Sequence, residues 1–194
     1  DVNFDYLRHV IRARLFLAIR MRARAMVEYR EALRFEPRAP KALNALAYLM
    51  FQENRLPEAE RLFLAALESN PRDAIAWFNL GFIRDKQRRL AEAVEAFQKA
   101  VELRPTIDRA WYGMGLAHAA LGAHDQAAIA LARAAELQPM HPHAWYNLGM
   151  AYHTLHRPEK VTEVIKHLHR FDPKMSRQLI LDAERADLAH LIGT

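Results

Sequence analysis

The histidines are the first residues in this chain whose type and spacing could support chemistry. The sequence contains ten, and six of them lie in one C-terminal stretch: His141, His143, His153, His156, His167 and His169. Imidazole is a common zinc ligand, but a zinc site needs three or four ligands that converge on one point. The helices expected here would instead distribute these side chains over a loop, a helix end and a second helix. We therefore expect solvated histidines and no metal or other cofactor.

Motifs of the common enzyme classes are absent from the sequence. It contains no glycine-rich phosphate loop, no G-x-S-x-G nucleophile turn and no H-E-x-x-H zinc-protease motif. It also contains no cysteine, which excludes a thiol nucleophile and a disulfide framework. We therefore predict that the chain is not an enzyme.

An arginine cluster dominates the charge of the chain, whose formal net charge is +5. The stretch from residue 6 to residue 27 has no acidic residue and contains Arg8, Arg12, Arg14, Arg20, Arg22 and Arg24. Three interpretations stay open: a solvated basic face, a segment beside the cytoplasmic face of a membrane, and a polyanion contact. Nucleic acid has little support, because no aromatic side chains interleave with these arginines for base stacking.

A 34-residue period organises the elements that carry these residues. Trp77, Trp111 and Trp145 are the only tryptophans, and each lies 34 residues from the next. Five prolines recur at the same interval: Pro37, Pro71, Pro105, Pro139 and Pro173. Residues 74–105 contain two amphipathic helical patterns joined by a short polar turn. A period of this length is typical of a stacked array in which each helix pair contacts only its neighbours.

This pattern resembles the tetratricopeptide repeat (TPR) family, in which W-x2-L-G-x2-Y, A-x3-F and a proline recur over about 34 residues. The best-matched period carries Trp77, Leu80, Gly81, Ala93, Phe97, Ala100 and Pro105. The first period departs most, with His9 and Arg12 where an aromatic residue and a leucine are usual. The resemblance implies an all-α, right-handed solenoid of antiparallel helix pairs.

The period also predicts where the repeats begin and end. After a lead-in at residues 1–5, we expect five repeats, at 6–39, 40–73, 74–107, 108–141 and 142–175. The period stops at residue 176, and residues 176–194 are expected to form a capping helix with Ser176 as its N-cap. The preference for arginine over lysine suggests a GC-rich, bacterial genome.

Single residues indicate how the helices begin, turn and pack. Pro40, Pro57, Pro142 and Pro158 suit first helical turns, and Asp73 and Thr106 suit N-caps. We expect turns within the pairs near Asn54, Arg88, Gly122 and His156, and a weaker break near Arg20. Close helix crossings are expected at Gly81, Gly115 and Gly149, and the tryptophans are expected in the core.

The resemblance further implies that the first helices of the repeats line a concave groove that binds partners. Carried over position by position, the partner-binding residues are Arg14, Lys41, Asn44, Tyr48, Phe78, Phe82, Arg109, Tyr112, Leu116, His143, Tyr146 and Met150. Many of these are aromatic or aliphatic, and exposed apolar stripes usually mark interaction sites. The lysine and asparagine pairs with which some TPR proteins grip a C-terminal carboxylate are missing.

We therefore predict a non-catalytic adaptor that binds a partner helix or an extended peptide in the groove. Two alternatives stay open: the soluble region of a membrane-anchored bacterial assembly factor for secretion, pili or exopolysaccharide, and the substrate-recruiting region of a larger enzyme. Self-association through the terminal helix or the basic first repeat is a further possibility. The expected location is the cytoplasm, including the inner face of the membrane.

Overall fold

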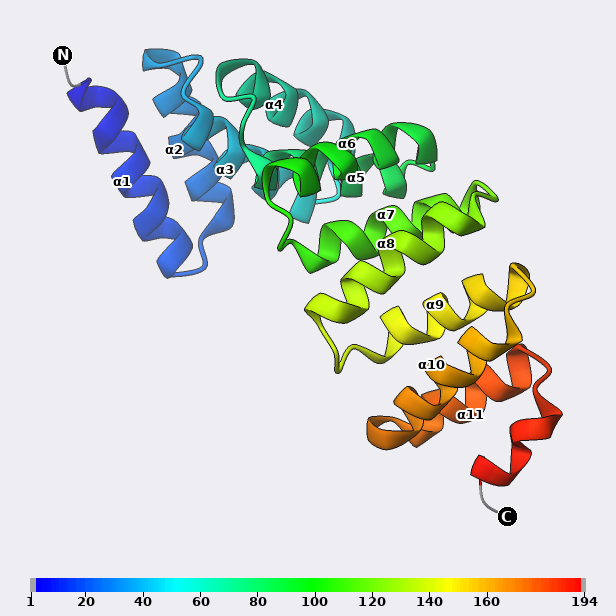
Figure 1. The fold of residues 1–194 in the computed structure, drawn as a ribbon. Coiled ribbons are helices and arrows are strands. Elements are labelled where there is room, and N and C mark those ends of the chain that lie inside the picture. The colour runs from blue at the N-terminus through cyan, green and yellow to red at the C-terminus, as the bar shows by residue number, and fades with distance from the viewer. Residues whose placement is uncertain (1–2, 193–194) are drawn as a thin grey trace. The chain divides into compact units, whose positions relative to one another are not determined.

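The computed structural model describes residues 3–192, and within them it contains eleven α-helices, one 3-10 helix and no strand (Figure 1). This confirms the all-α prediction. The elements are α1 (Phe4–Ala18), α2 (Arg22–Phe35), α3 (Pro40–Gln52), α4 (Leu56–Ser69), α5 (Ala74–Lys86), α6 (Leu90–Leu103), α7 (Asp108–Ala120), α8 (His124–Leu137), α9 (Pro142–Thr154), α10 (Pro158–Phe171), α11 (Pro173–Asp182) and the 3-10 helix η1 (Ala186–Ile192).

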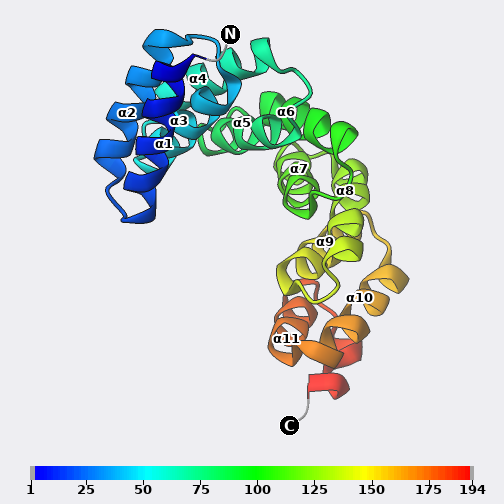
Figure 2. The ribbon, with the colours of Figure 1, turned by 90° about the vertical axis from the view of Figure 1, so that its left-hand side faces the viewer.

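The chain divides into two compact units, Asp1–Arg88 and Arg89–Thr194. In the first unit each of the helices α1 to α5 packs on the next along the chain, and α3 also contacts α5. In the second unit the same order holds from α6 to α11, with further contacts of α9 to α7 and α11. Figure 2 shows the helices α9, α10 and α11 packed together in this unit. Consecutive helix packing is the arrangement that the 34-residue period predicts.

The turn inside each helix pair has the same backbone conformation in every period. A positive φ occurs at Arg20 (60°), Asn54 (59°), Arg88 (62°), Gly122 (78°) and His156 (54°). The next residue closes the turn with a hydrogen bond to a carbonyl five residues back, as in Arg55 N to Met50 O at 2.9 Å. This is the Schellman ending of a helix. The expected turns, including the break near Arg20, are therefore confirmed.

The helix starts agree with the sequence at most positions. Asp73 caps α5, because its Oδ1 accepts hydrogen bonds from the N–H groups of Ile75 and Ala76, each at 3.0 Å. The four expected prolines lie in the first turns of α3, α4, α9 and α10. Thr106 does not cap α7, so that prediction is wrong. Ile107 holds the N-cap position without a side-chain hydrogen bond, and α7 begins at Asp108.

The chain termini differ from the prediction. Helix α1 begins at Phe4, inside the expected lead-in, with Asn3 Oδ1 accepting a hydrogen bond from Tyr6 N at 3.1 Å. At the other end α11 begins three residues before Ser176, because Asp172 Oδ1 caps it by accepting from Met175 N at 2.9 Å. The expected ranges 1–5 and 176–194 include residues 1–2 and 193–194, which lie outside the described residues.

Ser176 is therefore not an N-cap. It is fully buried inside α11, and its hydroxyl donates a hydrogen bond to Ile165 O of α10 at 3.2 Å. The helix ends at Asp182, and a positive φ of 54° at Glu184 turns the chain into η1. The single long terminal helix that we expected is thus two short elements that cover the end of the second unit.

Two of the expected close crossings are confirmed, and in both the nearest atoms belong to a leucine side chain. A methyl group on Gly115 would lie 2.6 Å from Leu131 Cγ of α8. A methyl group on Gly149 would lie 2.5 Å from Leu179 Cδ2. Leu179 belongs to α11, so this second crossing holds the terminal helix and not the partner helix within the same pair.

The tryptophans are partly buried, and Trp111 and Trp145 pack against the core of the second unit without being enclosed by it. Each indole Nε1 donates a hydrogen bond to the proline carbonyl six residues earlier: Trp77 to Pro71 at 2.9 Å, Trp111 to Pro105 at 2.8 Å and Trp145 to Pro139 at 2.9 Å. The indole ring therefore closes the loop before its helix while one side of it packs inward. This bond explains why tryptophan and proline recur with the same period.

Candidate functional site

In the second unit, the predicted partner-binding residues lie on one side of α7 and α9. Tyr112, Leu116, Tyr146 and Met150 are partly buried, and all four pack against one core cluster that includes Leu131, Leu148 and Ile165. Arg109 and His143 are exposed at the starts of the same helices. The structure therefore brings four apolar side chains together on a supported surface. We call these four residues the α7–α9 face.

Polar contacts fix the Tyr112 ring on the α7–α9 face. Asn147 Nδ2 donates a hydrogen bond to the Tyr112 hydroxyl at 3.2 Å and another to His143 O at 2.8 Å. The His141 ring meets the Tyr112 ring edge-on at 5.2 Å between centroids. Burial raises the pKa of Tyr112, and the hydrogen bond from Asn147 opposes this rise. The tyrosine is therefore neutral and held in place at neutral pH.

The repeat pattern did not place Asn147 or His141 beside Tyr112. Asn147 follows the predicted position Tyr146, and His141 precedes the helix that carries it. His141 is the N-cap of α9, since its Nδ1 accepts a hydrogen bond from Ala144 N at 3.0 Å. Only the spatial neighbourhood of α7 and α9 shows that both residues support Tyr112.

In the first unit, the predicted residues form an aromatic cluster with one buried member. Rings of α3 and α5 follow one another with centroid distances of 6.4 Å for Tyr48 to Phe51, 5.6 Å for Phe51 to Phe82 and 6.3 Å for Phe82 to Phe78. Tyr48 is 47% exposed, whereas Phe78 is only 9% exposed. The prediction that Phe78 lies on an exposed surface is therefore wrong, because its ring is part of the core.

The polar residues predicted in the first unit have mixed surroundings. Asn44 Nδ2 donates a hydrogen bond to Asp73 Oδ2 at 2.8 Å, so this side chain holds the residue that caps α5. Arg14 lies beside Tyr29 and counteracts the rise in the pKa of that tyrosine, which burial causes. Lys41 is exposed. Of these three, Lys41 alone retains the purely surface setting that was predicted.

Two of the C-terminal histidines have structural positions. His167 lies against Trp145 with 4.0 Å between ring centroids, and His156 occupies a left-handed turn. Across residues 3–192 no group of three or more histidine, cysteine, aspartate or glutamate side chains could hold a metal ion. No helix in this range is both long and apolar enough to cross a membrane.

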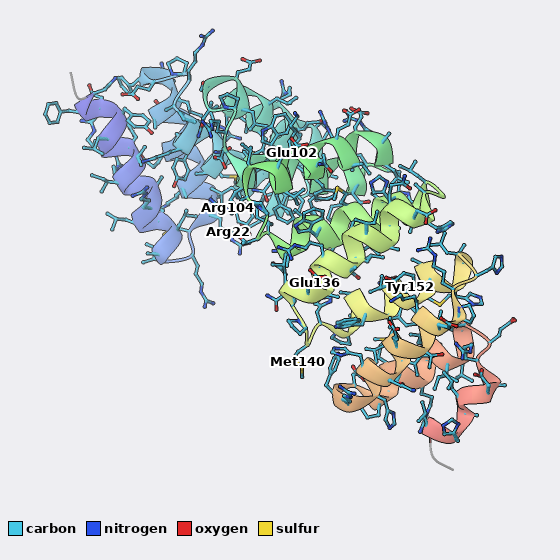
Figure 3. The ribbon with its side chains drawn as sticks, in the orientation of Figure 1. Arg22, Glu102, Arg104, Glu136, Met140 and Tyr152 are labelled. Carbon is cyan, nitrogen blue, oxygen red and sulfur yellow. The ribbon has the colours of Figure 1, made fainter. Side chains whose placement is uncertain are left out.

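A further pocket in the second unit is lined mainly by α8, together with residues of α7 and α9. Its volume is about 640 Å³, and Trp111, Glu136 and Tyr152 contribute to its walls. Figure 3 labels the last two residues, together with Met140, which is 68% exposed in the loop between α8 and α9. Charged side chains, among them Arg133 and Arg157, line this pocket as well. Its walls therefore mix apolar and charged side chains.

Comparison with protein families identifies the class of this fold. Three overlapping segments match the model of the tetratricopeptide repeat, at residues 51–106, 84–139 and 112–160. Together they cover residues 51–160, which is more than half of the chain. The chain belongs to the tetratricopeptide repeat family, and the match indicates no catalytic family. A comparison with proteins of curated function gives no match.

Solved structures show the same fold. The chain is similar to YrrB, a TPR protein with an unusual peptide-binding site, with 25% identity, 94% of each chain covered and a TM-score of 0.81. It is also similar in fold to MamA from Desulfovibrio magneticus RS-1, with 18% identity, 96% and 98% of the two chains covered and a TM-score of 0.76. The corresponding values for PilF from Pseudomonas aeruginosa are 20%, 97% and 89%, and 0.74.

Proposed function

We propose that this chain is a non-catalytic interaction scaffold that binds a partner helix or an extended peptide on the α7–α9 face. The observation that carries the proposal is that Tyr112, Leu116, Tyr146 and Met150, all partly exposed, pack against one core cluster from the two contacting first helices α7 and α9. Contiguous apolar side chains that remain partly exposed usually mark an interaction site. Aromatic residues are also frequent anchors of protein interfaces.

The face suits recognition because its side chains are already held in position. Asn147 fixes the hydroxyl of Tyr112, and Asp182 fixes that of Tyr146. A ligand that contacts these rings does not have to pay for ordering them, and pre-ordering of this kind favours affinity. Amphipathic helices and extended segments both carry apolar side chains at regular intervals. Such side chains can contact successive residues of the α7–α9 face.

The likeness to YrrB supports a peptide partner. That protein is a TPR protein with a peptide-binding site, and the two chains match over 94% of their lengths. In the first unit, Tyr48, Phe51 and Phe82 of the aromatic cluster are not fully buried, and Tyr48 and Phe82 are the two among them that were predicted to bind a partner. We propose that they contribute to the same function. We also propose that residues 6–175 form five repeats of 34 residues and that the residues after them form a cap.

A pull-down from native lysate followed by mass spectrometry tests the proposal. The parent chain is compared with a Tyr112→Ala/Tyr146→Ala variant and with an Ile129→Ala/Met140→Ala control. The control removes two apolar side chains that are 69% and 68% exposed elsewhere in the same unit. Circular dichroism first establishes that both variants remain helical.

We expect partners that the parent and the control retain and the tyrosine variant loses. A partner set that the folded tyrosine variant leaves unchanged would contradict binding on the α7–α9 face.

A further inference from the structure

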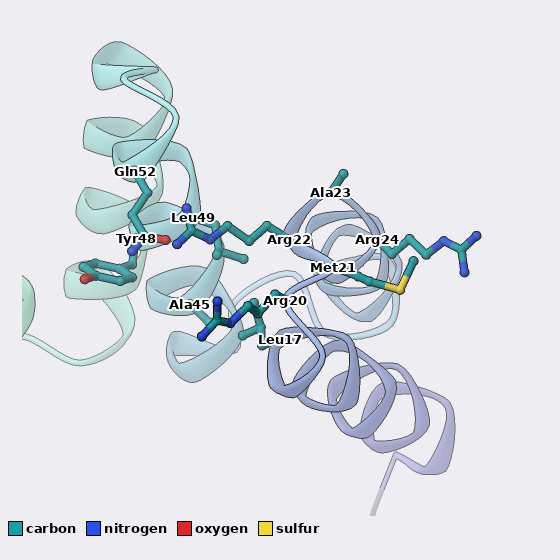
Figure 4. A pocket seen from close by; sticks show the side chains of 10 residues that line it. All are labelled: Leu17, Arg20, Met21, Arg22, Ala23, Arg24, Ala45, Tyr48, Leu49 and Gln52. Carbon is teal, nitrogen blue, oxygen red and sulfur yellow. The ribbon is translucent and has the colours of Figure 1, made fainter.

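A basic pocket lies in the first unit between the α1–α2 turn and α3 (Figure 4). Its volume is about 1070 Å³. Leu17 and Leu49 contribute apolar side chains to its lining, together with Arg20, Arg22 and Tyr48. The pocket therefore combines apolar and cationic side chains, next to Tyr48, the most exposed ring of the aromatic cluster.

Two of the arginines are directed at α3. Figure 4 shows the side chains of Arg20 and Arg22 extending toward Ala45 and Tyr48, whereas Arg24 points away. Arg24 instead lies over the Phe16 ring at 5.8 Å from its centroid. Neither Arg20 nor Arg22 forms an ion pair or a side-chain hydrogen bond with any residue between 3 and 192. Their guanidinium groups therefore retain their hydrogen-bonding capacity.

In each of the next two periods one arginine at this turn forms an ion pair. Arg55 pairs with Glu58 and Arg89 pairs with Glu92, three residues apart in each case. The equivalent positions in the first period are Met21 and Arg24, and the first turn of α2 contains no acidic residue. Positive charge at the start of a helix opposes the helix dipole. The arginines at this turn are therefore not explained by helix stability.

We infer that this pocket binds an acidic segment of a protein partner, with an apolar side chain of the segment in contact with Leu17 and Leu49. The inference rests on the proposed peptide binding and specifies the chemistry of the peptide that reaches the first unit. Guanidinium groups bind carboxylates through paired hydrogen bonds, and arginine and tyrosine are favoured at interface anchors. A nucleic-acid backbone supplies negative charge without an apolar side chain that could contact Leu17 and Leu49.

Fluorescence anisotropy with two labelled peptides tests this inference. In the first peptide glutamates alternate with leucines, and in the second glutamines replace the glutamates. We expect the parent chain to bind the glutamate peptide roughly tenfold more tightly than the glutamine peptide. An Arg20→Gln/Arg22→Gln variant is expected to lose this preference and to bind both peptides alike. A single Arg22→Gln variant should lose part of it.

The matched control is Arg38→Gln/Arg72→Gln, which removes the same charge at two exposed positions outside the pocket. This control should keep the preference for glutamate, and thermal unfolding confirms that all variants are folded. Equal binding of the two peptides by the parent chain, or a preference that the Arg20→Gln/Arg22→Gln variant keeps, overturns the inference.

Two further outcomes separate this inference from the proposed function. If the glutamine peptide binds and Tyr112→Ala/Tyr146→Ala abolishes its binding, the proposed function stands whatever happens to the glutamate preference. If neither peptide binds, this inference fails, and the pull-down with the Tyr112→Ala/Tyr146→Ala variant decides the proposed function by itself. Vesicles of phosphatidylserine and phosphatidylcholine serve as a competitor. Vesicle binding that displaces the glutamate peptide and requires Arg20 and Arg22 would assign the pocket to lipid and overturn the protein partner.

Discussion

The Tyr146 hydroxyl donates a hydrogen bond to Asp182 Oδ2 at 2.5 Å and thereby joins α9 to α11. The same carboxylate accepts hydrogen bonds from Gln178 Nε2 at 2.8 and 2.9 Å. The hydrogen bond to Asp182 raises the pKa of Tyr146 to about 12, and it lowers the pKa of Asp182. The terminal helix therefore holds the hydroxyl of a proposed binding residue and leaves its ring to face a ligand.

Removing only this hydroxyl should separate binding from the attachment of α11. In a Tyr146→Phe variant we expect peptide affinity within roughly twofold of the parent, because the ring stays in place. In a Tyr146→Ala variant we expect a loss of about tenfold or more, as for other aromatic anchors. Anisotropy with a peptide selected against the parent chain measures both. Equal losses in the two variants would assign binding to the hydroxyl instead of the ring.

The pH dependence of the attachment of α11 follows from the two pKa shifts. Because the folded state lowers the pKa of Asp182, its contribution to stability is present above the ordinary value of 3.8 and is lost as pH falls through the lowered pKa. Because the folded state raises the pKa of Tyr146, that contribution is present below 10.0 and is lost as pH rises toward about 12.

Absorbance of tyrosinate measures the alkaline limb. The difference between the parent chain and Tyr146→Phe should show one tyrosine that titrates near pH 12. In an Asp182→Asn variant the pKa of Tyr146 should fall toward the ordinary value for tyrosine, because the carboxylate that opposes its ionisation is gone. A Tyr146 titration near pH 10 in the parent would show that the hydrogen bond does not persist in solution.

Replacing either of two glycines with alanine should lower the stability of the chain. In Gly115→Ala and Gly149→Ala the new methyl groups would lie 2.6 Å from Leu131 Cγ and 2.5 Å from Leu179 Cδ2. Overpacking of this kind costs about 1–3 kcal/mol, and the helix propensity of alanine returns about 1 kcal/mol. Urea unfolding should therefore show a net destabilisation, with the larger loss at Gly115, where Leu131 N also lies only 3.2 Å from the added methyl.

The control for this pair is Gly122→Asn. Gly122 has a φ of 78° and no atom within 4 Å of an added Cβ. Asparagine tolerates this left-handed conformation better than most residues, so we expect only a small change in unfolding free energy. Parent-like stability of both alanine variants would mean that the crossings at Leu131 and Leu179 are looser than described.

The hydrogen bonds from the indole rings to the proline carbonyls should contribute measurably to the free energy of unfolding. Replacing Trp111 with phenylalanine keeps an aromatic ring but removes the donor to Pro105 O, which lies at 2.8 Å. We expect a loss of about 0.5–1.5 kcal/mol in unfolding free energy, the usual net value of one hydrogen bond. Trp77→Phe and Trp145→Phe should fall in the same range. No loss in any of the three would contradict a structural role for these bonds.

Much of this fold could be predicted from the sequence, because the 34-residue period repeats local features. Asp73, the prolines at helix starts and the residues at the left-handed turns act through neighbours within a few positions. The prediction for Thr106 was wrong by one position. The N-cap of α7 is the next residue, Ile107, and Thr106 lies too far from the first N–H groups of the helix to cap them. The start of α11 was misjudged because Asp172 both follows one helix and caps the next.

The binding surfaces were harder to predict, because burial depends on which neighbour covers a position. Leu49, Ile83, Ala117 and Ala151 occupy equivalent positions and are at most 4% exposed, whereas Leu15 at the equivalent place in α1 is 62% exposed. No helix pair precedes α1 within the described residues. Phe78 shows the opposite case, in which a ring expected on the surface is covered. Contacts between side chains on different helices, such as Asn147 with Tyr112, have no local sequence pattern.

Chemical-shift mapping of a selected peptide on the labelled chain tests the central claim most directly. A peptide is selected from a random library against the parent chain and titrated while backbone amide shifts are recorded. We predict that the shifts concentrate at Tyr112, Leu116, Tyr146 and Met150 of α7 and α9, and that Tyr112→Ala/Tyr146→Ala abolishes them. Shifts confined to the second helices α8 and α10, or unchanged binding by the folded variant, would contradict a partner-binding α7–α9 face.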